Sequence, residues 1–497
     1  MWYTGQNRKS KSHKREVWKM PAFKTNVVTG PALLALSENV RGWQKRDCYR
    51  QLNSYLYNAE CDRVCLLFGL RRTGKTTLLR QAVLDMTPEN AAKTAYIKAT
   101  KRDTIADLNR DMEQLRSLGF RYVLLDEVTL MRDFIDSAAL LSDIYAAQGM
   151  KIVLSGTDSL GFWFALHQEL YDRAKMIHTT FIPYREHSRL LGIDQIDEYI
   201  RYGGTLRAGE LAETASFRDD ESTRRYIDTA ICKNIQHSLA CCEDGGHFRH
   251  LRPLYEAGEL TGAINRIIED MNHAFLVSVL TRDFLSHDLG LAARNLRKKQ
   301  TVPITKAHVA EIKEYLAALD LIVDCPIETT EPSSESVEHI LFTQPGMRYC
   351  QAQALVQALM KDELFLSLSE KERETITNRI LEEVRGRMLE DIVLLETSKA
   401  LGSRYKVCKL QFASGEFDML VYDREKNCCT AFEIKHSQQA APEQARHLRD
   451  AEKCALTERR FGKLVGKYVL YLGENKSTED GLSYRNAEEF LKELPDF

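Results

Sequence analysis

A glycine-rich segment with one lysine and one threonine carries the strongest chemical pattern in the chain, Gly69-Leu70-Arg71-Arg72-Thr73-Gly74-Lys75-Thr76. The spacing G-x-x-x-x-G-K-T lets the backbone curl so that amide N–H groups point at phosphate oxygens. Lys75 supplies a charge for the β- and γ-phosphates, and the Thr76 hydroxyl is a ligand for Mg²⁺. We therefore predict a nucleotide site formed by Gly69, Thr73, Gly74, Lys75, Thr76 and Thr77.

Two adjacent acids, Asp126 and Glu127, end the apolar run that begins at Tyr122. They follow the glycine-rich segment by about fifty residues, which is the arrangement of a Walker B strand after a phosphate-binding loop. Asp126 would hold the Mg²⁺ shell, and Glu127 would polarise the attacking water as a general base. Two acids together predict a hydrolase rather than a passive nucleotide binder.

A third apolar run, Lys151–Leu154, ends in the polar residues Ser155 and Thr157. In the inferred sheet this strand end lies beside the glycine-rich loop, so Ser155 or Thr157 would sense the γ-phosphate or place the water. In the second interpretation, this polar segment caps the N-terminus of a following helix through Asp158 or Ser159. The two interpretations are compatible.

Short apolar runs that alternate with amphipathic helical stretches must position these residues. The runs are Val64–Phe68, Thr94–Ile97, Tyr122–Leu125, Lys151–Leu154 and Met176–Thr180. Strands and helices in alternation predict a parallel sheet with helices on both faces. We expect an α/β multidomain chain whose nucleotide-binding domain covers residues 41–205.

The segments GLRRTGKTTLL at 69–79, YVLLDEV at 122–128 and IVLSGTDS at 152–159 resemble prokaryotic AAA-type ATPases related to the archaeal ATPase family. In that group a P-loop domain is followed by a winged helix and a restriction-endonuclease-like domain. The resemblance implies ATP and Mg²⁺ as cofactors. It covers residues from about 40 to 205 well and the C-terminal segment in part.

The resemblance also singles out an arginine after the third polar strand end. Tyr171-Asp172-Arg173-Ala174 is similar to the family's segment at that place, and Arg173 matches the arginine that can reach nucleotide phosphate. Such a charge would neutralise the departing γ-phosphate, in its own chain or in a neighbour's site. Arg185 is a weaker candidate. The alternative for either arginine is a surface salt bridge, for example to Asp172 or Glu186.

A second group of acids lies between residues 386 and 435 and resembles the PD-(D/E)XK nuclease core. It consists of Glu390 on a predicted helix, Asp418 on a strand and Glu433-Ile434-Lys435 on the next strand. Positions i and i+2 of a strand share a face, so Glu433 and Lys435 point the same way and Asp418 can face them. The resemblance implies Mg²⁺ held by Glu390, Asp418 and Glu433, with Lys435 activating water. Solvated strand charges, or a nuclease fold that binds without cutting, are the alternatives.

The remaining regions are predicted from pattern and charge. Residues 1–40 form a basic N-terminal arm, a solvated tail or a nucleic-acid contact. Residues 206–370 are helical and end in a winged-helix pattern: a helix at Thr305–Leu319, a strand at 321–325, a polar loop and a returning strand at His339–Thr343. A winged helix serves DNA binding or packing between domains. Residues 371–497 form the nuclease-like domain.

Composition excludes several classes. Of 497 residues, 44% are hydrophobic and 28% are charged, which is typical of folded globular chains. Lys plus Arg is 69 and Asp plus Glu is 71, so the net charge of −2 excludes a basic coat over the whole chain. No apolar run is long enough for a membrane span, and the polar N-terminus is no secretory signal. Twelve scattered cysteines predict reduced thiols in a cytoplasmic protein.

The sequence therefore predicts a Mg²⁺-dependent ATPase that acts as a nucleotide-driven switch on a DNA-binding or nuclease-like C-terminal half. One alternative is a non-catalytic, nucleotide-gated DNA-binding or signalling regulator with an inert nuclease fold. The other is an ATP-dependent switch for a protein partner. ATP is the expected ligand, DNA and a protein are candidate partners, and an oligomer is compatible with the sequence.

Overall fold

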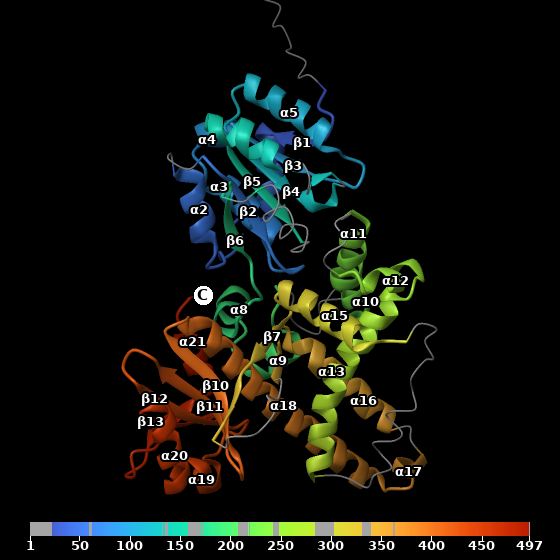
Figure 1. Ribbon diagram of the computed structural model, residues 1–497. Helices are drawn as coiled ribbons and strands as arrows, with labels where there is room; N and C mark the ends of the chain where they lie inside the picture. Colours follow the sequence, from blue (N-terminus) through green and yellow to red (C-terminus); the bar gives the residue numbers. More distant parts are fainter. Residues whose placement is uncertain are drawn as a thin grey trace, which may run out of the picture.

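The computed structural model describes residues 22–58, 62–131, 133–134, 138–157, 170, 172–206, 217, 219–241, 248–283, 303–330, 339–360 and 363–496. The basic segment 1–20, Asp158, Ser159 and the polar loop at 331–336 lie outside these residues. Figure 1 shows the N-terminal sheet above, the C-terminal sheet below it, and a helical region beside the C-terminal sheet.

The N-terminal sheet has six strands in the order β1-β3-β4-β5-β2-β6. They are β1 (Asn26–Thr29), β2 (Val64–Phe68), β3 (Thr94–Lys98), β4 (Tyr122–Asp126), β5 (Lys151–Gly156) and β6 (Ala174–His178). All adjacent pairs are parallel except β1 with β3. The predicted α/β fold with a parallel sheet is confirmed.

Strand β6 begins two residues before the predicted run at Met176–Thr180. It is an edge strand, and its span is set by pairing with β2, in which Val64 is opposite Ala174 and Phe68 is opposite His178. The apolar run was a poor guide to the bounds of this strand, because its Met176 side chain is exposed and not part of the core. The backbone beyond His178 turns toward the glycine-rich loop, where Thr179 N–H donates to Phe68 O at 2.7 Å.

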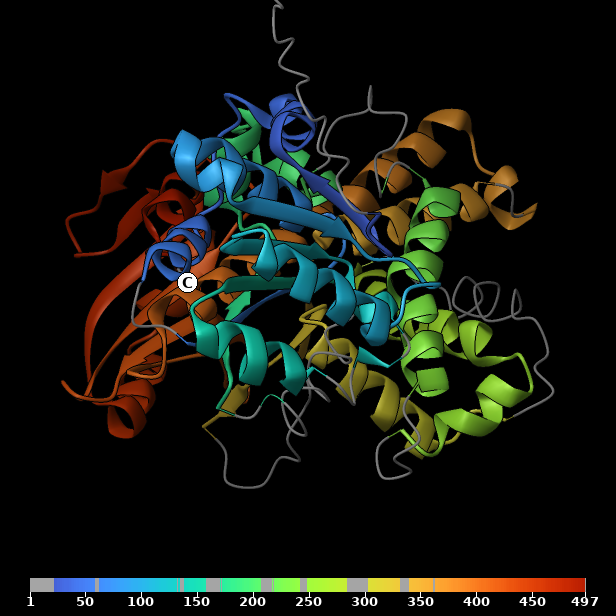
Figure 2. The ribbon, with the colours of Figure 1, turned by 90° about the horizontal axis from the view of Figure 1, so that it is seen from above.

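Helices cover both faces of this sheet because side chains alternate along each strand. The helices are α1 (Gly30–Ser37), α2 (Tyr49–Tyr57), α3 (Lys75–Asp85) and α5 (Ile105–Ser117). Cys65 and Leu67 of β2 share a core with α1, α2 and α3. Val64 and Leu66, which point the other way, share a core with α5. Figure 2, seen from above, shows the helices on the two sides of the strands.

The N-terminal arm is shorter than the predicted residues 1–40. Asn26–Thr29 pairs as β1 with β3, so the sheet begins well before residue 41. The buried carboxylate of Asp111 on α5 fixes this segment, since it accepts the backbone N–H groups of Lys24 and Thr25 at 2.8 and 2.7 Å. A four-residue strand at the edge of a sheet is weakly marked in the sequence, because its pairing with β3 and not its own composition defines it.

The C-terminal sheet has seven strands in the order β14-β15-β13-β12-β11-β10-β8. They are β8 (Ile327–Thr329), β10 (Tyr405–Gln411), β11 (Glu416–Asp423), β12 (Cys428–Ile434), β13 (Lys463–Tyr471), β14 (Lys476–Ser477) and β15 (Ser483–Asn486). The long helix α18 (Glu370–Leu401) packs against β10, β11 and β12. A helix followed by a strand-rich region is the predicted element order.

The middle region is helical, as predicted. Its helices include α10 (Asp220–Ile227), α11 (Lys233–Cys241), α12 (Leu251–Glu256), α13 (Leu260–Asp283), α15 (Lys306–Ala318) and α16 (Pro345–Leu359). Strands β7 (Ile322–Cys325) and β9 (His339–Phe342) pair antiparallel after α15, as the winged-helix pattern requires. Strand β8 instead leaves this pair and joins β10 in parallel. The winged-helix assignment and the domain boundaries stay predictions.

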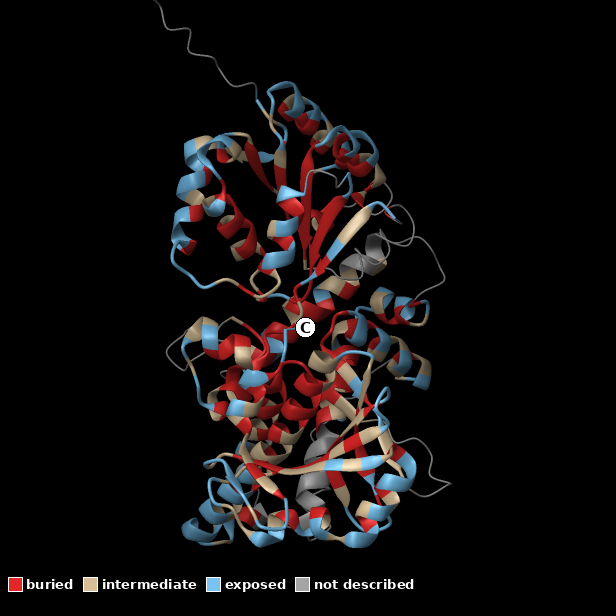
Figure 3. Ribbon diagram, turned by 90° about the vertical axis from the view of Figure 1, so that its left-hand side faces the viewer, coloured by how far each residue is buried: buried red, intermediate tan, exposed pale blue. Residues whose placement is uncertain are grey.

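Two large hydrophobic cores cross the predicted boundaries. One extends from Val64 on β2 to Met347 on α16, and the other from Phe181 to Leu494. Figure 3 shows buried residues concentrated in the strands of the upper sheet and in the helices midway between the two sheets. The middle region therefore shares a core with each sheet. No helix among the described residues is both long and apolar enough to cross a membrane.

A buried ion pair fastens the N-terminal sheet to the segment that follows it. The Arg46 guanidinium contacts the Glu186 carboxylate at the start of α8 (Tyr184–Leu191) at 2.7 and 3.1 Å. Both side chains are less than a tenth exposed. Arg46 also donates to the carbonyl of Thr73 in the glycine-rich loop at 3.0 Å.

A second buried acid joins this segment to α18. The Glu396 carboxylate accepts the Tyr184 backbone N–H at 2.7 Å and the hydroxyl of Tyr199, on α9 (Ile196–Tyr202), at 2.9 Å. Burial raises the pKa of Glu396 to about 8, although both hydrogen bonds act in the opposite direction. Helix α18 therefore contacts the backbone at the start of α8.

Arg46→Met should lower the free energy of unfolding by about 3–5 kcal/mol, because it leaves the Glu186 charge buried without its partner. The double variant Arg46→Met/Glu186→Gln should lose clearly less than the sum of the two single variants. Urea unfolding monitored by circular dichroism measures both quantities. Additive losses would show that the two side chains do not stabilise each other.

Glu396→Gln should remove a pH dependence of stability. The ordinary pKa of this group is 4.5 and the folded value is about 8, so the folded chain keeps a proton that the unfolded chain releases. Stability therefore falls as the pH rises through this window, by roughly 1–3 kcal/mol. Glutamine keeps the acceptor for Tyr184 and Tyr199 but does not titrate. Unfolding midpoints at pH 5 and pH 8 should lie closer together in the variant than in the wild type, and an unchanged difference would contradict the assignment.

Candidate active site

The loop between β2 and α3 needs glycine at two positions. Gly69 has φ +143°, and a Cβ there would lie 2.3 Å from the Thr179 carbonyl oxygen. Gly74 has φ +91° and directly precedes α3. Both are backbone conformations that side chains rarely adopt. The predicted loop therefore folds as a tight turn into a helix N-terminus.

Lys75 fills the centre of this loop. Its ammonium donates to the carbonyls of Gly69 and Leu70 at 2.8 and 2.7 Å. Burial lowers the pKa of Lys75 to about 8, while the carboxylates of Glu127 and Asp126 act in the opposite direction. The cation is thus held among the loop carbonyls, where phosphate oxygens would give it stronger partners.

The two flanking threonines differ in environment. The Thr73 hydroxyl is fully buried and bonds to the Leu70 carbonyl at 2.7 Å and the Thr179 hydroxyl at 2.9 Å. Its side chain therefore holds the loop together and leaves only its backbone for a ligand. Thr77 lies one turn into α3 and lines a neighbouring pocket.

Asp126 lies at the carboxyl edge of the sheet and collects hydroxyl and ammonium donors. Thr76, Tyr96 and Lys98 contact its Oδ2 at 2.9, 2.8 and 2.8 Å, and Ser155 contacts Oδ1 at 3.2 Å. Burial would raise the pKa of Asp126, but Lys98 and these hydrogen bonds outweigh it and lower the pKa. The carboxylate is therefore held ionised.

Tyr96 and Lys98 are site residues that the sequence reasoning missed. Both lie on β3, whose residue Lys98 pairs with Asp126 on β4. The available signal was the polar residue that directly follows the apolar run Thr94–Ile97, at the same sheet edge as Asp126. That Lys98 lies opposite Asp126 could be recognised only from the strand order.

The donor set fits a magnesium ion. The Thr76 hydroxyl and the Asp126 carboxylate are adjacent oxygens of the kind that Mg²⁺ prefers, at the mouth of a phosphate-sized loop. The Lys98 ammonium, which is 2.8 Å from the same carboxylate, shows that the position accepts a cation. Thr76 and Asp126 would therefore hold the ion.

Glu127 follows Asp126 in a left-handed conformation, with φ +60°. The Thr157 hydroxyl donates to its Oε2 at 3.2 Å, and the Asn234 side chain of α11 reaches the Thr157 carbonyl at 3.4 Å. The structure thus brings the two predicted residues together and adds Asn234 from the middle region. The positive φ is a conformation that side-chain-bearing residues rarely adopt, and it directly follows the last residue of β4.

Arg173 is not brought to the loop of its own chain, and its predicted role at a neighbour's site stays a prediction. It directly precedes β6, and its carbonyl accepts Val64 N–H at the start of β2, whereas the loop lies at the other end of β2. Five strand residues separate the two ends, or about 16 Å. Its side chain instead pairs with Asp143 at 2.8 Å. Because β6 runs parallel to β2, Arg173 lies at the edge of the sheet where β2 begins, opposite the edge with the loop.

Arg185 is also engaged elsewhere. Its guanidinium bonds to Asp47 and to Asp496 near the C-terminus. The proposed partners Asp172 and Glu186 pair with Arg63 and Arg46 instead. Arg46 is the arginine that contacts the loop, and no motif in the sequence pointed to it.

A pocket of about 360 Å³ opens beside the loop. Gly74 and Thr77 form its loop side, and Trp43, Leu190 and Leu206 contribute apolar walls. Gln44 and Gln81 are polar groups in the same lining. Apolar walls with a few amides suit a flat heterocycle next to a phosphate-binding loop.

The C-terminal sheet brings together three of the four predicted residues. Met419 on β11 is paired with Phe432 on β12, so Asp418 and Glu433 are the next opposite positions and share a face. The Lys435 ammonium contacts the carboxylates of Asp418 and Glu433 at 2.8 Å each. The Glu433 Oε1 atom is buried without a hydrogen-bond partner.

Asp418, Glu433 and the neighbouring lysines shift one another's pKa values. Burial and the nearby Asp418 raise the pKa of Glu433 to about 8. Burial would also raise the pKa of Asp418, but Lys435 and Lys409 outweigh it and lower the pKa. The pair therefore shares a single negative charge opposite Lys435.

Glu390 on α18 lies at the margin of this group. Its carboxylate contacts the buried Lys409 ammonium at 3.3 Å, and Lys409 also approaches Glu416 at 3.9 Å. Burial and Asp418 raise the pKa of Glu390 to about 7. Within the described ranges, no group of three or more His, Cys, Asp or Glu side chains is spaced to hold a metal ion. The set Glu390, Asp418 and Glu433 stays a prediction.

Lys409 was missed because it interrupts the strand pattern. A β-bulge between Cys408 and Leu410 leaves residues 407 to 410 all buried, so alternation fails there. The bulge turns Lys409 toward Glu390. A lysine inside an apolar strand was the available signal.

Residues 62–188 match the sequence profile of a family described as "AAA domain". No curated protein matches the chain. Among solved structures, Aeropyrum pernix Orc1 in complex with DNA is similar at 14% identity, 68% coverage of this chain, 97% of that chain and a TM-score of 0.27. C. elegans PCH-2 is similar at 13% identity, 72% and 67% coverage and a TM-score of 0.23. A katanin structure on self-assembly is similar at 10% identity, 59% and 91% coverage and a TM-score of 0.22.

The family match spans β2 to α8, and within it lie the glycine loop, Lys75, Asp126, Glu127 and Thr157. The sheet order and the loop geometry agree with that match. Residues 62–188 of this chain therefore have a P-loop NTPase fold and are similar to the AAA domain family.

Proposed function

We propose that this chain is a Mg²⁺-dependent ATPase whose nucleotide state is passed to its C-terminal half. The observation that carries the proposal is the grouping of Lys75, Asp126 and Glu127 at one edge of the sheet, next to a glycine loop that opens a helix. These are a cation for the phosphates, a carboxylate for the metal and a carboxylate for water. The family match supports it.

Each residue has a separate task. Backbone N–H groups of the loop and the start of α3 bind phosphate oxygens, and Lys75 leaves the loop carbonyls to pair with them. Thr76 and Asp126 would hold magnesium, which would supply positive charge for the β- and γ-phosphates. Glu127 accepts a proton from the attacking water, and Thr157 holds its carboxylate in place.

The pocket lined by Trp43, Gln81 and Leu206 would take the base and ribose. It adjoins Gly74 and Thr77, so one ligand can fill the loop and the pocket together. Trp43 is more than half exposed, and covering it with a base would remove apolar surface from water. The amides of Gln44 and Gln81 are the polar groups able to read the edge of the base.

The proposed connection between the P-loop and the C-terminal half is the backbone between β6 and α8. Thr179 bonds to Thr73 in the loop, and Arg46 joins Thr73 to Glu186. The N–H of Tyr184, at the start of α8, bonds to Glu396 on α18. Any shift of the loop on hydrolysis would therefore act on the helix that also carries Glu390. A regulator with an inert C-terminal half, or a switch for a protein partner, would use the same route.

Metal-dependent phosphodiester cleavage is a second candidate function, for the C-terminal sheet. The observation that favours it is the contact of Lys435 with both Asp418 and Glu433, on opposite positions of two adjacent strands. The unpartnered Glu433 Oε1 offers one further acceptor for a cation. DNA is the proposed substrate, and the pair β7–β9 with α15 would be the DNA-binding winged helix.

Glu127→Gln should keep ATP binding and lower ATP turnover by at least about 100-fold, because the amide cannot accept the proton of water. A coupled phosphate-release assay and ATP binding by calorimetry measure the two effects. Glu113→Gln, an exposed acid on α5, is the matched control and should leave both unchanged. Unchanged turnover in Glu127→Gln would refute the assigned base.

Lys435→Ala should abolish cleavage of DNA in Mg²⁺ or Mn²⁺, because it removes the cation between Asp418 and Glu433. Lys463→Ala, at an exposed position of β13, is the control and should cut like the wild type. Plasmid nicking on gels is the measurement. A wild-type chain that cuts neither DNA nor RNA would favour the inert-fold alternative.

A further inference from the structure

Lys98 is a cation at the candidate active site that none of the steps above uses. It ends β3, and its register partner is Asp126, the last residue of β4. Its ammonium contacts Asp126 Oδ2 at 2.8 Å, the same oxygen that the Thr76 hydroxyl contacts at 2.9 Å. Lys98 therefore lies next to the two oxygens that would hold the metal ion.

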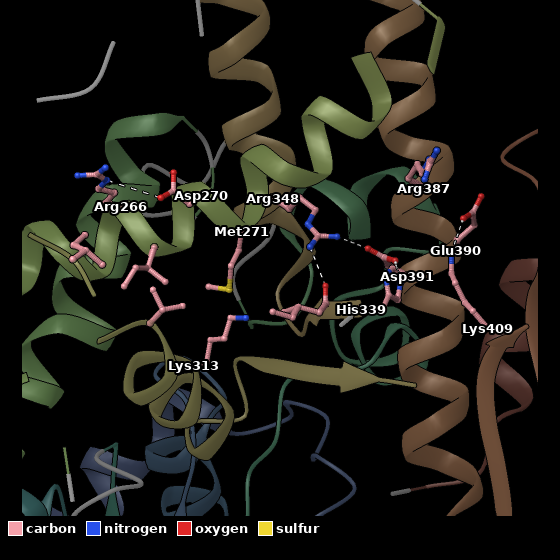
Figure 4. A pocket seen from close by; sticks show the side chains of 14 residues that line it. Arg266, Asp270, Met271, Lys313, His339, Arg348, Arg387, Glu390, Asp391 and Lys409 are labelled. Atoms are coloured by element: carbon pink, nitrogen blue, oxygen red, sulfur yellow. Dashed lines mark hydrogen bonds and ion pairs between the residues drawn. The ribbon is translucent and has the colours of Figure 1, made fainter. Parts of the chain in front are cut away.

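The exposure of Lys98 distinguishes it from a purely structural counter-ion. Its side chain is 44% exposed, although the carboxylate that it contacts is almost fully buried. Lys409 is the contrasting case, since Figure 4 shows it against Glu390 on α18 and its side chain is only 6% exposed. Lys409 is enclosed by its partners, whereas Lys98 has solvent beside it and a flexible stem. The contact of Lys98 with Asp126 is thus one that a ligand can replace.

Asp126 has other hydrogen-bond donors besides Lys98. The hydroxyls of Thr76, Tyr96 and Ser155 also contact this carboxylate, at 2.9, 2.8 and 3.2 Å. The Lys98 ammonium would be repelled by a Mg²⁺ ion on the same oxygen, because two like charges at contact distance are unfavourable. Lys98 would therefore leave Asp126 when the carboxylate takes a metal ion, and its charge would need another anion.

The terminal phosphate of the nucleotide is the anion that comes to this position. A metal ion on Thr76 and Asp126 bridges oxygens of the β- and γ-phosphates, so these oxygens lie beside the ammonium of Lys98. Electrostatics agree with this placement: burial is the main cause of the lowered pKa of Lys75, and the charge of Lys98 acts in the same direction. The two ammonium groups therefore act on the same region of the site.

The arginines expected to meet the departing phosphate are engaged elsewhere in their own chain. Arg173 pairs with Asp143 at 2.8 Å, and Arg185 pairs with Asp47 at 2.5 Å. Lys98 is instead brought by the sheet itself to the metal end of the site, through the pairing of β3 with β4.

We propose that Lys98 is a catalytic residue of the ATPase: its ammonium contacts Asp126 until Mg²⁺ and ATP bind, and then contacts the γ-phosphate. There it neutralises charge that builds on the departing phosphate. This role rests on the proposed function. It also makes Lys98 a residue that distinguishes ATP from ADP, since ADP has no γ-phosphate.

Binding of ATP and of ADP with Mg²⁺, measured by calorimetry on the full chain that carries Glu127→Gln, tests this role without turnover. Adding Lys98→Gln, whose amide can still donate to Asp126 but has no charge, should weaken ATP binding at least about tenfold and ADP binding less than about twofold. Lys98→Arg keeps the charge and should keep the preference for ATP. Lys101→Gln removes an exposed charge just after β3 and is the control, which should change neither affinity.

The possible results separate the role of Lys98 from the proposed function. Unchanged ATP binding in Lys98→Gln, or equal weakening of ATP and ADP, would overturn the role of Lys98 and leave the ATPase assignment intact. A loss in Lys98→Arg as large as that in Lys98→Gln would also overturn it, because the charge would then not matter. If the Glu127→Gln chain alone binds neither nucleotide, the proposed function fails, and the role of Lys98 fails with it.

Turnover gives a second readout in the chain that keeps Glu127. Lys98→Gln should lower kcat at least about tenfold, because the contact with the γ-phosphate strengthens as charge builds on it. Lys101→Gln should leave kcat unchanged. An unchanged kcat in Lys98→Gln would refute the catalytic role.

Discussion

The buried Arg46 guanidinium is the interaction on which the arrangement of the molecule depends. It bonds to Thr73 in the P-loop, to the carbonyls of Thr180 and Phe181 after β6, and to Glu186 on α8. A buried charge is costly unless it is paired and fully hydrogen-bonded, so these partners must stay together. One side chain therefore fixes the loop relative to the chain that leads to the C-terminal half.

In both candidate sites a lysine ammonium contacts buried carboxylates. At the sheet edge, Lys98 contacts the buried carboxylate of Asp126, and in the C-terminal sheet Lys435 contacts Asp418 and Glu433. Neighbouring acids without a cation would repel each other and take up protons. The lysines favour the ionised form of Asp126 and Asp418.

The helix α18 links features that are far apart in the sequence. Glu396 contacts the segment after β6, Asp391 contacts Arg348 on α16, and Glu390 contacts Lys409 in the C-terminal sheet. All three contacts lie on one 32-residue helix. Under the proposed function, ATP hydrolysis and chemistry at the C-terminal sheet would then share this helix.

The sequence by itself determined the local features. The spacing from Gly69 to Thr76 and the apolar runs that end at Asp126 and Ser155 located the loop and the strands around it, because short-range backbone geometry and alternation depend on nearby residues. It missed β1 and misplaced β6, since edge strands are set by partners rather than by their own composition. Only the tertiary structure decided which residues meet: Arg46 with the loop, Lys98 with Asp126, and Arg173 at the opposite sheet edge. Strand order and burial are long-range properties, and one sequence read locally does not contain them.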